Sequence, residues 1–374
     1  MSLFARSDTS LLSRWWWEVD RWALITLLLL AAIGIVLTMA ASPAVADRLD
    51  LDPFYFARRQ AIYLPLSLVV LVLTSLMSPT GVQRTASLMF ALFFVLTVAT
   101  LFLGAEVKGA RRWLSLGGIS LQPSEFLKPA FAVACAWLFS RARLTGTYGG
   151  YALGTALLIA VVAVLARQPD IGTSVLMLGA WSVQVFLAGC PLVLVGLLAM
   201  LFLGGGVFAY MMFGHVRDRV DHFLNPATGD GFQVASALEA FRSGGFFGRG
   251  PGEGRVKEVL PDAHADFIFA VAGEEMGLLA CLVIVFLFAL VVLKALGRAL
   301  KGHDLFAVLA TASLAALFGA QALMNMASTL HLIPPKGITL PFISYGGSAT
   351  IALAWAMGMV LALTRERPNT GEVP

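Results

Sequence analysis

The sequence has little charge. Its 374 residues include only 26 Lys and Arg and 22 Asp and Glu, so 13% of the side chains are charged, against about 25% in soluble domains. Hydrophobic residues make up 59% of the chain. So few charges cannot cover the surface of a water-soluble protein of this size, which excludes an ordinary soluble fold.

Cysteine is also scarce, and the basic charge is not clustered. Cys135, Cys190 and Cys281 lie within or at the edges of apolar stretches, too far apart to indicate a disulfide framework or a metal cluster. The net charge of +4 comes from Lys and Arg scattered through polar segments, with no basic face or arm. We therefore expect no nucleic-acid partner.

What the sequence does contain is a series of charge-poor apolar runs. A run of about 20 such residues can cross a bilayer as a helix. We therefore predict an all-α polytopic integral membrane protein with ten transmembrane helices. The ten runs lie near residues 22–42, 60–77, 85–104, 126–140, 150–166, 171–189, 191–213, 266–297, 305–331 and 346–364.

One polar segment interrupts this pattern. Residues 213–264 carry 13 charges in 52 residues and separate the seventh run from the eighth. We predict a large loop here, with a short amphipathic helix on the membrane surface, marked by Val234, Leu238 and Phe241. The glycine-rich stretch 248–255 is either a flexible linker or a loop that contacts phosphate. The predicted divisions are a tail at 1–21, helices 1–7 within 22–212, the loop at 213–264, helices 8–10 within 265–364, and a tail at 365–374.

A second polar segment has the pattern of a β-hairpin. Two alternating stretches, 113–116 and 119–122, flank a Gly-Gly pair, which is a strong signal for a two-residue turn. In this register Leu116 faces Ile119, Leu114 faces Leu121, and Ser115 faces Ser120. Three cations precede the hairpin at head-group depth, where they either meet phosphate or anchor the chain at the interface: Lys108, Arg111 and Arg112.

The fourth apolar run begins with two opposite charges. Ser124, after a proline, is the predicted N-cap of the helix. Glu125 and Lys128 are three residues apart and therefore share one helix face. A lone charge in the bilayer is unfavourable by roughly 2.5–3.5 kcal/mol, so we expect the two to pair beside a polar cavity. The alternative is an interfacial acid and a lysine that snorkels to the surface.

The strongest chemical signal stands where the eighth run begins. Asp266 follows the polar loop and precedes apolar helix, which places a carboxylate at the boundary between water and membrane for acid–base work. The alternative is that it only caps the helix. Glu274 and Glu275 lie about two turns further on and must face protein or water.

Two breaks separate other runs. Gln168-Pro169-Asp170 lies between the fifth and sixth runs, and irregular sequence at 333–348 lies between the ninth and tenth. The helix that starts near Gly346 would aim its free N–H groups at an anion. Gln321 and Asn325, four residues apart on the ninth run, either extend a polar lining or bond between helices, and the second is favoured.

Five ordered strings carry a resemblance to a known family. KGARRWLSLGGISLQPSEFLKP, QPDIG, SGGFFGRGPGEG, LPDAHADFIFAVAGEEMG and PPKGITLPFISYGGS are similar to the signatures of the SEDS peptidoglycan glycosyltransferases (RodA, FtsW and SpoVE). The resemblance covers about residues 20–365. The N-terminal segment 15–21 resembles the division branch, FtsW, more than the elongation branch. The segment 325–331 departs from the glycine-rich pattern of many relatives and carries Ala327 and His331.

The resemblance implies a topology and a location. Both termini would be cytoplasmic and the loop 213–264 would lie outside, an orientation that the distribution of Lys and Arg does not decide. The protein would reside in the bacterial inner membrane, at the division septum. Its expected partners are membrane lipid, a class B penicillin-binding protein and other divisome membrane proteins.

The resemblance also implies a reaction. Members polymerise lipid II: the 4-hydroxyl of one GlcNAc attacks C1 of another molecule's MurNAc, with inversion, and undecaprenyl pyrophosphate leaves. By position in the motifs, Asp266, Glu125 and Lys128 match the family's essential residues, and Asp266 would take the hydroxyl proton or hold a divalent cation, Mg or Mn. The candidates for substrate binding are Lys108, Arg111, Arg112, Gln168, Asp170, Arg249, His264, Lys336, Ser344 and Gly346.

Two functions of another class remain compatible with the residues. A transporter that flips lipid II, or a division scaffold without activity, would also have many spans, broken helices and intramembrane charges. The position of Asp266 at the mouth of the bundle, beside a large polar loop, favours an enzyme. A transport site would instead lie near mid-membrane between repeated halves, and the sequence has no clear internal repeat.

Overall fold

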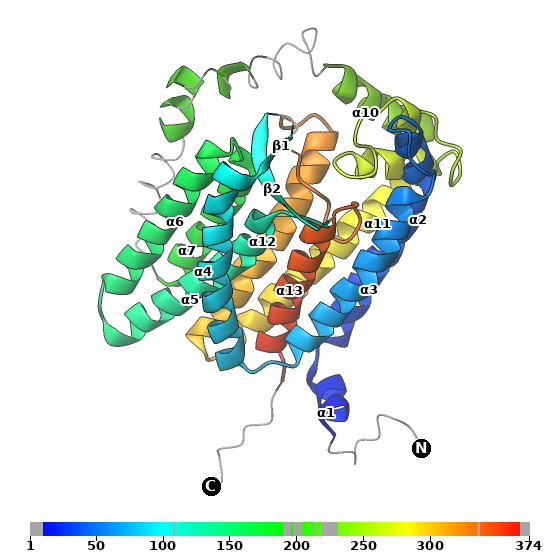
Figure 1. Ribbon diagram of the computed structural model, residues 1–374. Helices are drawn as coiled ribbons and strands as arrows, with labels where there is room; N and C mark the ends of the chain where they lie inside the picture. The colour runs from blue at the N-terminus through cyan, green and yellow to red at the C-terminus, as the bar shows by residue number, and fades with distance from the viewer. Residues whose placement is uncertain are drawn as a thin grey trace.

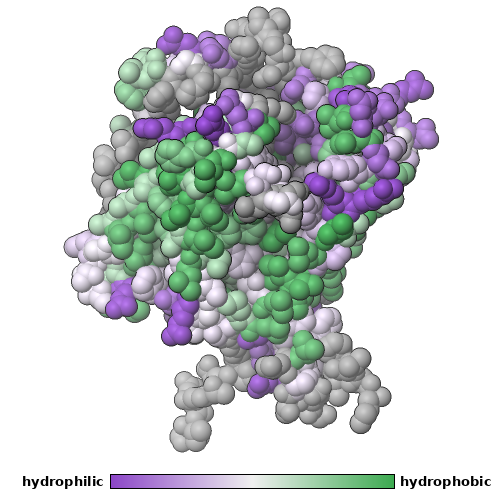
Figure 2. Space-filling model, viewed as in Figure 1, coloured by the Kyte–Doolittle hydropathy of each residue, from purple (hydrophilic) through white to green (hydrophobic). Residues whose placement is uncertain are grey.

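The chain folds into one bundle of helices that run side by side (Figure 1). The computed structural model describes residues 10–107, 109–117, 119–189, 231–334 and 337–366, with single residues and short stretches from 196 to 221. Six of the described helices are long and apolar enough to cross a membrane. A hydrophobic surface covers the middle of the molecule, with hydrophilic residues gathered beyond it (Figure 2). The protein is therefore a mostly helical polytopic membrane protein.

Nine of the ten predicted runs coincide with helices in the described part of the chain. More than half of the run 191–213 lies outside the described residues, so the count of ten spans remains a prediction. The first half contains α1 (Leu11–Glu18), α2 (Arg21–Asp47), α3 (Tyr55–Ser75), α4 (Pro79–Leu103), α5 (Pro123–Thr145), α6 (Gly149–Arg167) and α7 (Ile171–Leu187). The second half contains α10 (Gly231–Gly244), a 3-10 turn (Val256–Glu258), α11 (Ile268–Ala299), α12 (Leu305–Thr329) and α13 (Gly347–Leu363).

Side-chain caps set several helix starts. Asp20 accepts a hydrogen bond from the Ala23 N–H at 3.1 Å and begins α2. The predicted cap at Ser124 is wrong, because α5 begins at Pro123 and Gln122 precedes it without a side-chain cap. Proline at the first helical position suits this start, since that position needs no N–H partner. The predicted N-terminal tail also contains a helix, α1.

Helix α5 is the centre of the bundle. Most of its residues are buried along its whole length, including Leu127, Phe131 and Phe139. It packs between α4 and α12, and the rings of Phe93 and Phe126 stack at 4.7 Å on the α4 side. Any side chain on the inner face of α5 is therefore enclosed by protein.

Both ends of the described chain lie at the same end of the bundle (Figure 1). Arg298, near the end of α11, contacts Asp20 at 2.8 Å, and Arg365 contacts Glu18 at 3.2 Å. The chain therefore returns to its starting side. The β-strands and α10 lie at the opposite end (Figure 1).

A three-stranded sheet stands at that opposite end. Strands β2 (Ala110–Leu116) and β3 (Ile119–Leu121) pair with the predicted register, Leu114 to Leu121, Ser115 to Ser120 and Leu116 to Ile119. The sequence did not predict a third strand, β1 (Ala105–Val107), which pairs with β2. Such a short edge strand has no alternating pattern of its own to detect.

The segment between α12 and α13 enters the bundle. Phe342 and Ile343 contact Gly34, which lies halfway along α2. The helix that follows, α13, has only 17 residues, shorter than the other apolar helices of this half. Irregular backbone therefore replaces the missing helical turns at this depth, as is tolerated only where protein surrounds it.

Helix α11 is broken at Gly277. This residue has φ 81° and ψ −179°, a conformation that only glycine adopts without strain. The N–H groups of Leu278 and Leu279 donate to the carbonyls of Gly245 and Phe246 at 2.9 and 3.3 Å. The backbone after α10 thus fills the break. About 22 residues follow it, a length of about 33 Å that matches the apolar thickness of a bilayer.

The predicted amphipathic helix exists as α10, but α11 covers it. Ala237 and Ala240 are fully buried, and Phe241 lies against Gly273 and 5.7 Å from the Phe269 ring. Small residues on this face let α10 approach the α11 backbone closely. One face of α10 therefore contacts protein, and its position relative to a membrane surface stays a prediction.

The break in α11 gives a test of this packing. Gly277→Ala should lower the free energy of unfolding by about 2–4 kcal/mol, because the new methyl group would meet the Gly248 N–H and lie 2.5 Å from the Phe246 carbonyl. Gly297→Ala is the matched control on the same helix, where nothing lies within 4 Å. It should stabilise by up to about 1 kcal/mol. Thermal unfolding in detergent measures both, and equal effects would contradict the assignment of the break.

Candidate active site

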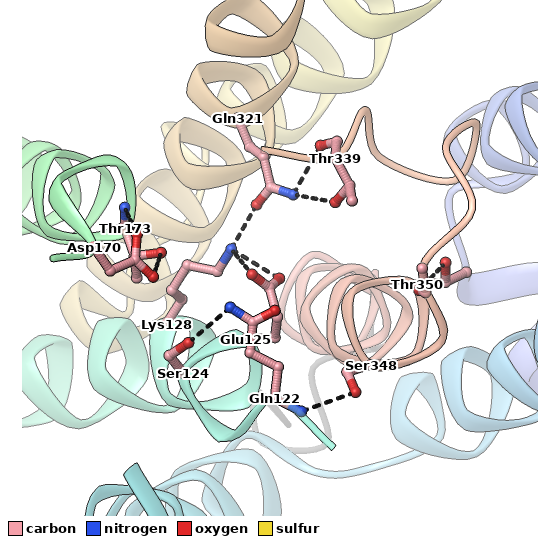
Figure 3. Close-up of polar contacts among 11 residues, drawn as sticks. Gln122, Ser124, Glu125, Lys128, Asp170, Thr173, Gln321, Thr339, Ser348 and Thr350 are labelled. Carbon is pink, nitrogen blue, oxygen red and sulfur yellow. Dashed lines mark hydrogen bonds and ion pairs between the residues drawn. The ribbon is translucent and has the colours of Figure 1, made fainter. Parts of the chain in front are cut away.

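Glu125 and Lys128 form a buried ion pair on α5 (Figure 3). The Lys128 Nζ lies 3.0 Å from Oε1 of Glu125 and 2.9 Å from Oε2. Glu125 is 8% exposed and Lys128 4% exposed. These values contradict the alternative of an interfacial acid and a snorkelling lysine. The prediction that the two residues pair is confirmed, but the narrow cavity that borders them between α5, α12 and α13 is lined mostly by apolar side chains, so the predicted polar cavity is wrong.

Asp266 is half-buried just before α11. The residue that caps α11 is Phe267, without a side-chain bond, so the alternative that Asp266 caps the helix is wrong. The Asn325 side chain donates to the Asp266 carbonyl at 2.9 Å. Gly337 borders the carboxylate, since a Cβ there would lie 3.4 Å from Oδ2. The backbone around this acid is therefore held by α12 and by the segment that follows it.

His264 and Ser344 hold the Asp266 segment against the 340–346 segment. The Ser344 hydroxyl donates to the Ala265 carbonyl at 2.6 Å, and the Tyr345 N–H donates to the His264 carbonyl at 2.9 Å. The His264 ring lies 4.1 Å from the Phe56 ring and 5.3 Å from the Tyr345 ring. Leu260 contacts Arg48 at the end of α2, which places this segment toward the end of the bundle opposite the termini.

Three other candidates meet one another away from this segment. Arg112 donates to the carbonyls of Gln168 and Pro169 at 3.0 and 2.7 Å. Gln168 donates to Thr97 and Thr100 on α4, and Asp170 caps α7 through Thr173. These contacts connect the hairpin to the break between α6 and α7. The side chains of Arg112, Gln168 and Asp170 therefore bind other parts of the protein, and the Arg112 guanidinium binds backbone carbonyls.

The remaining candidates are dispersed. Arg111 forms an exposed ion pair with Glu106 at 3.4 Å, and the exposed Arg249 donates to the Ser243 carbonyl at 3.3 Å. Gly346 precedes the first residue of α13. The Ser348 hydroxyl there accepts from the Gln122 N–H (Figure 3) and donates to the Ser120 carbonyl. Lys108 and Lys336 lie outside the described residues.

The glycine-rich stretch is held against α11, so the alternative of a flexible linker is wrong, while contact of its side chains with phosphate stays a prediction. Its backbone N–H groups at Arg255 and Val256 donate to the Glu274 carboxylate at 2.8–3.1 Å. Glu275 accepts from the Gly252 N–H at 3.1 Å and pairs with the buried Lys257. Two carboxylates of the protein itself therefore occupy the anion-binding backbone of this loop.

No group of three or more metal-binding side chains is present among the described residues. Asp266 is therefore not part of a closed site of protein ligands within the described residues. A cation held there would need further ligands from a substrate phosphate and from water, as Mg²⁺ often does.

The sequence indicated that Asp266, His264 and Ser344 belong to one site, but not how their segments meet. They meet through hydrogen bonds from Ser344 and Tyr345 to the carbonyls of Ala265 and His264, about 80 residues earlier in the chain. Sequence reasoning did not assign Gln321, Asn325 or Thr339 to the site. The signal for the first two was their i,i+4 spacing in an apolar helix, and their bonds between segments confirm the favoured interpretation.

Comparisons with known proteins agree along nearly the whole chain. A family model described as "Cell cycle protein", for FtsW, RodA and SpoVE, matches residues 20–369. The chain is 43% identical over 367 residues to a Caulobacter vibrioides protein named "Probable peptidoglycan glycosyltransferase FtsW", which covers 98% of this chain and 94% of that protein. It is 31% identical to "Stage V sporulation protein E" of Bacillus subtilis, over 91% of this chain and 95% of that protein.

Solved structures share the fold. A chain of a peptidoglycan synthase complex, described as showing structural coordination of polymerization and crosslinking, superposes with a TM-score of 0.77 at 27% identity. It covers 92% of this chain and 97% of that one. The rod shape determining protein RodA of Thermus thermophilus gives a TM-score of 0.69 at 27% identity, over 93% and 97% of the two chains.

The buried ion pair can be tested by neutralising one partner or both. Lys128→Met should lower the free energy of unfolding by about 3–5 kcal/mol, because it leaves the Glu125 carboxylate buried without a cation. The double variant Glu125→Gln with Lys128→Met should recover most of that loss, since no unpaired charge remains. Unfolding in detergent micelles checks both. A double variant as unstable as the single one would show that the charges are not paired.

Proposed function

The chain belongs to the FtsW, RodA and SpoVE family, and on this basis we propose that it is a peptidoglycan glycosyltransferase that polymerises lipid II during septal wall synthesis. The relatives named peptidoglycan glycosyltransferase support the enzyme class. The observation that carries the chemistry is the half-buried Asp266 carboxylate, held by backbone bonds near the end of the bundle opposite the termini.

In this proposal Asp266 acts on the acceptor sugar. As the 4-hydroxyl oxygen of GlcNAc bonds to C1 of the donor MurNAc, the bond from C1 to the pyrophosphate oxygen breaks and the hydroxyl proton passes to the carboxylate. Undecaprenyl pyrophosphate leaves with the negative charge. In the alternative form of the proposal Asp266 would hold a divalent cation, which would supply positive charge to neutralise the leaving pyrophosphate.

Glu125 and Lys128 have a different role in the proposal. Their charges neutralise each other inside the bundle, so the pair maintains a polar connection between α5 and α12. Arg111, Arg249, Lys108, Lys336 and the start of α13 at Gly346 remain candidates for steadying pyrophosphate. Gln168, Asp170 and Arg112 would act by holding the hairpin, since their contacts are within the protein.

The finer topology is part of the same proposal. Ten spans would place both termini in the cytoplasm and the loop 213–264 outside, and the meeting of the two chain ends supports an even number of crossings. Asp266 would then lie on the outer side. The protein would be a multi-pass protein of the bacterial inner membrane at the division septum.

The proposed partner is a class B penicillin-binding protein. The structural neighbour from a peptidoglycan synthase complex that couples polymerization to crosslinking supports a transpeptidase partner. Lipid II as substrate and other divisome proteins as further partners complete the proposal.

A polymerisation assay of the unmodified protein and of an Asp266 variant distinguishes this enzyme from a flippase or a scaffold. Asp266→Asn should leave a folded protein that makes no glycan, a loss of at least about a hundredfold for a general base or charge-holding group. Purified protein with lipid II and a partner transpeptidase, scored for polymer on a gel, measures it.

Asp262→Asn is the matched control. It removes a carboxylate from the same segment, and asparagine tolerates the φ of 51° found there. It should retain activity. Polymer from the Asp266 variant would reject the role of that residue, and no polymer from the unmodified protein would favour a flippase or scaffold.

A further inference from the structure

Gln321 lies where two parts of the candidate site meet (Figure 3). Its side chain is 2% exposed. The amide oxygen accepts from the Lys128 Nζ at 2.8 Å, and the amide nitrogen lies 3.1 Å from the Thr339 carbonyl and 3.3 Å from its Oγ1. One amide therefore joins the ion pair on α5 to the irregular segment after α12.

Lys128 determines which way this amide points. An ammonium group can only donate hydrogen bonds, so Gln321 must turn its oxygen toward Lys128. The Thr339 carbonyl can only accept, so it requires the NH₂ group. Both neighbours thus require the same orientation, and a reversed amide would lose its bonds on both sides in a buried place.

The residues before Thr339 reach Asp266. Asn325, one turn along α12 from Gln321, donates to the Ile338 carbonyl at 2.7 Å and to the Asp266 carbonyl at 2.9 Å. Gly337 borders the Asp266 carboxylate. Three consecutive residues, 337 to 339, therefore connect the carboxylate to both amides of α12.

This segment depends on those amides. The carbonyls of Ile338 and Thr339 accept from side chains of α12, where a helix or a strand would provide backbone donors. With the Gln321 amide removed, of the two α12 amides only Asn325 would still hold the segment.

We propose that Gln321 is a positioning residue, which Lys128 orients and which holds residues 337–339 in place against Asp266. Its effect on catalysis rests on the proposed function, whereas its effect on the segment does not. Gln321 does not contact the reacting atoms, so it acts through the segment on the carboxylate.

A second buried glutamine provides the control. Gln184 on α7 is fully buried, and its nitrogen donates to the Ala132 carbonyl at 2.6 Å and to the Ser313 hydroxyl at 2.7 Å. Gln321→Met and Gln184→Met each remove one buried amide of the same kind. Gln321→Met should lose more stability, because Gln321 also accepts from the charged Lys128, but a purely structural role for Gln321 predicts no specific loss of kcat.

Hydrogen exchange of the full-length protein in detergent tests the positioning without substrate. Gln321→Met should speed exchange in peptides covering residues 337–346 by roughly tenfold, and Gln184→Met should leave them unchanged. Lys128→Met combined with Glu125→Gln should give a smaller increase in the same peptides, because the amide loses its orienting partner. Unchanged exchange in the Gln321 variant, or an equal increase in the Gln184 variant, would overturn the proposal.

Polymerisation of lipid II tests the catalytic consequence. Gln321→Met should lower kcat roughly tenfold or more with little change in KM, and Gln321→Glu should do the same, because a carboxylate accepts from Lys128 but cannot donate to Thr339. Gln184→Met should keep the kcat of the unmodified protein. If the unmodified protein makes no polymer, the proposed function fails while the exchange result still decides the positioning. Full kcat in the Gln321 variants of an active enzyme would overturn the catalytic part.

Discussion

A charge inside an apolar bundle must have a partner, and this requirement organises the inner part of the protein. Lys128 pairs with Glu125 on α5, and Lys257 pairs with Glu275 beside α11. Lys128 also donates to Gln321 of α12, which in turn binds Thr339 of the irregular segment. Lys257 also donates to the Gly252 carbonyl, and the Gly252 N–H donates to Glu275. The buried charges therefore attach irregular segments to the helices.

The same requirement applies to the backbone where helices are interrupted. The break in α11 exposes N–H groups that the carbonyls of residues 245 and 246 satisfy. The segment 337–346 lacks regular structure, and side chains of Gln321, Asn325 and Ser344 bind its backbone. An unsatisfied backbone group in hydrocarbon is unfavourable by several kcal/mol, so these attachments decide where the interruptions can lie. Asp266 lies beside the second interruption, since Gly337 borders its carboxylate and Ser344 binds the carbonyl of Ala265.

Some of this arrangement could be predicted from the sequence because it depends on neighbours in the chain. The alternation around the Gly-Gly pair predicted the register of β2 and β3, and the three-residue spacing predicted the pair of Glu125 and Lys128. The predicted N-cap of α5, Ser124, lies inside the helix, because Pro123 takes the first helical position and Gln122 precedes it. A proline fits there because the N–H that it lacks has no partner within the helix. The burial of α10 could not be predicted, since its apolar pattern fits a membrane surface and a protein surface equally.

What the sequence by itself determined is therefore the class of protein, its apolar helices and the residue types at the site, because composition and periodicity are local properties. What only the tertiary structure decided is which of these residues meet. The bond from Gln321 to Lys128 joins residues 193 positions apart, and that from Ser344 to Ala265 joins residues 79 apart. Contacts of such separation depend on how the helices pack, and the spacing of residues along one helix carries no information about its neighbour.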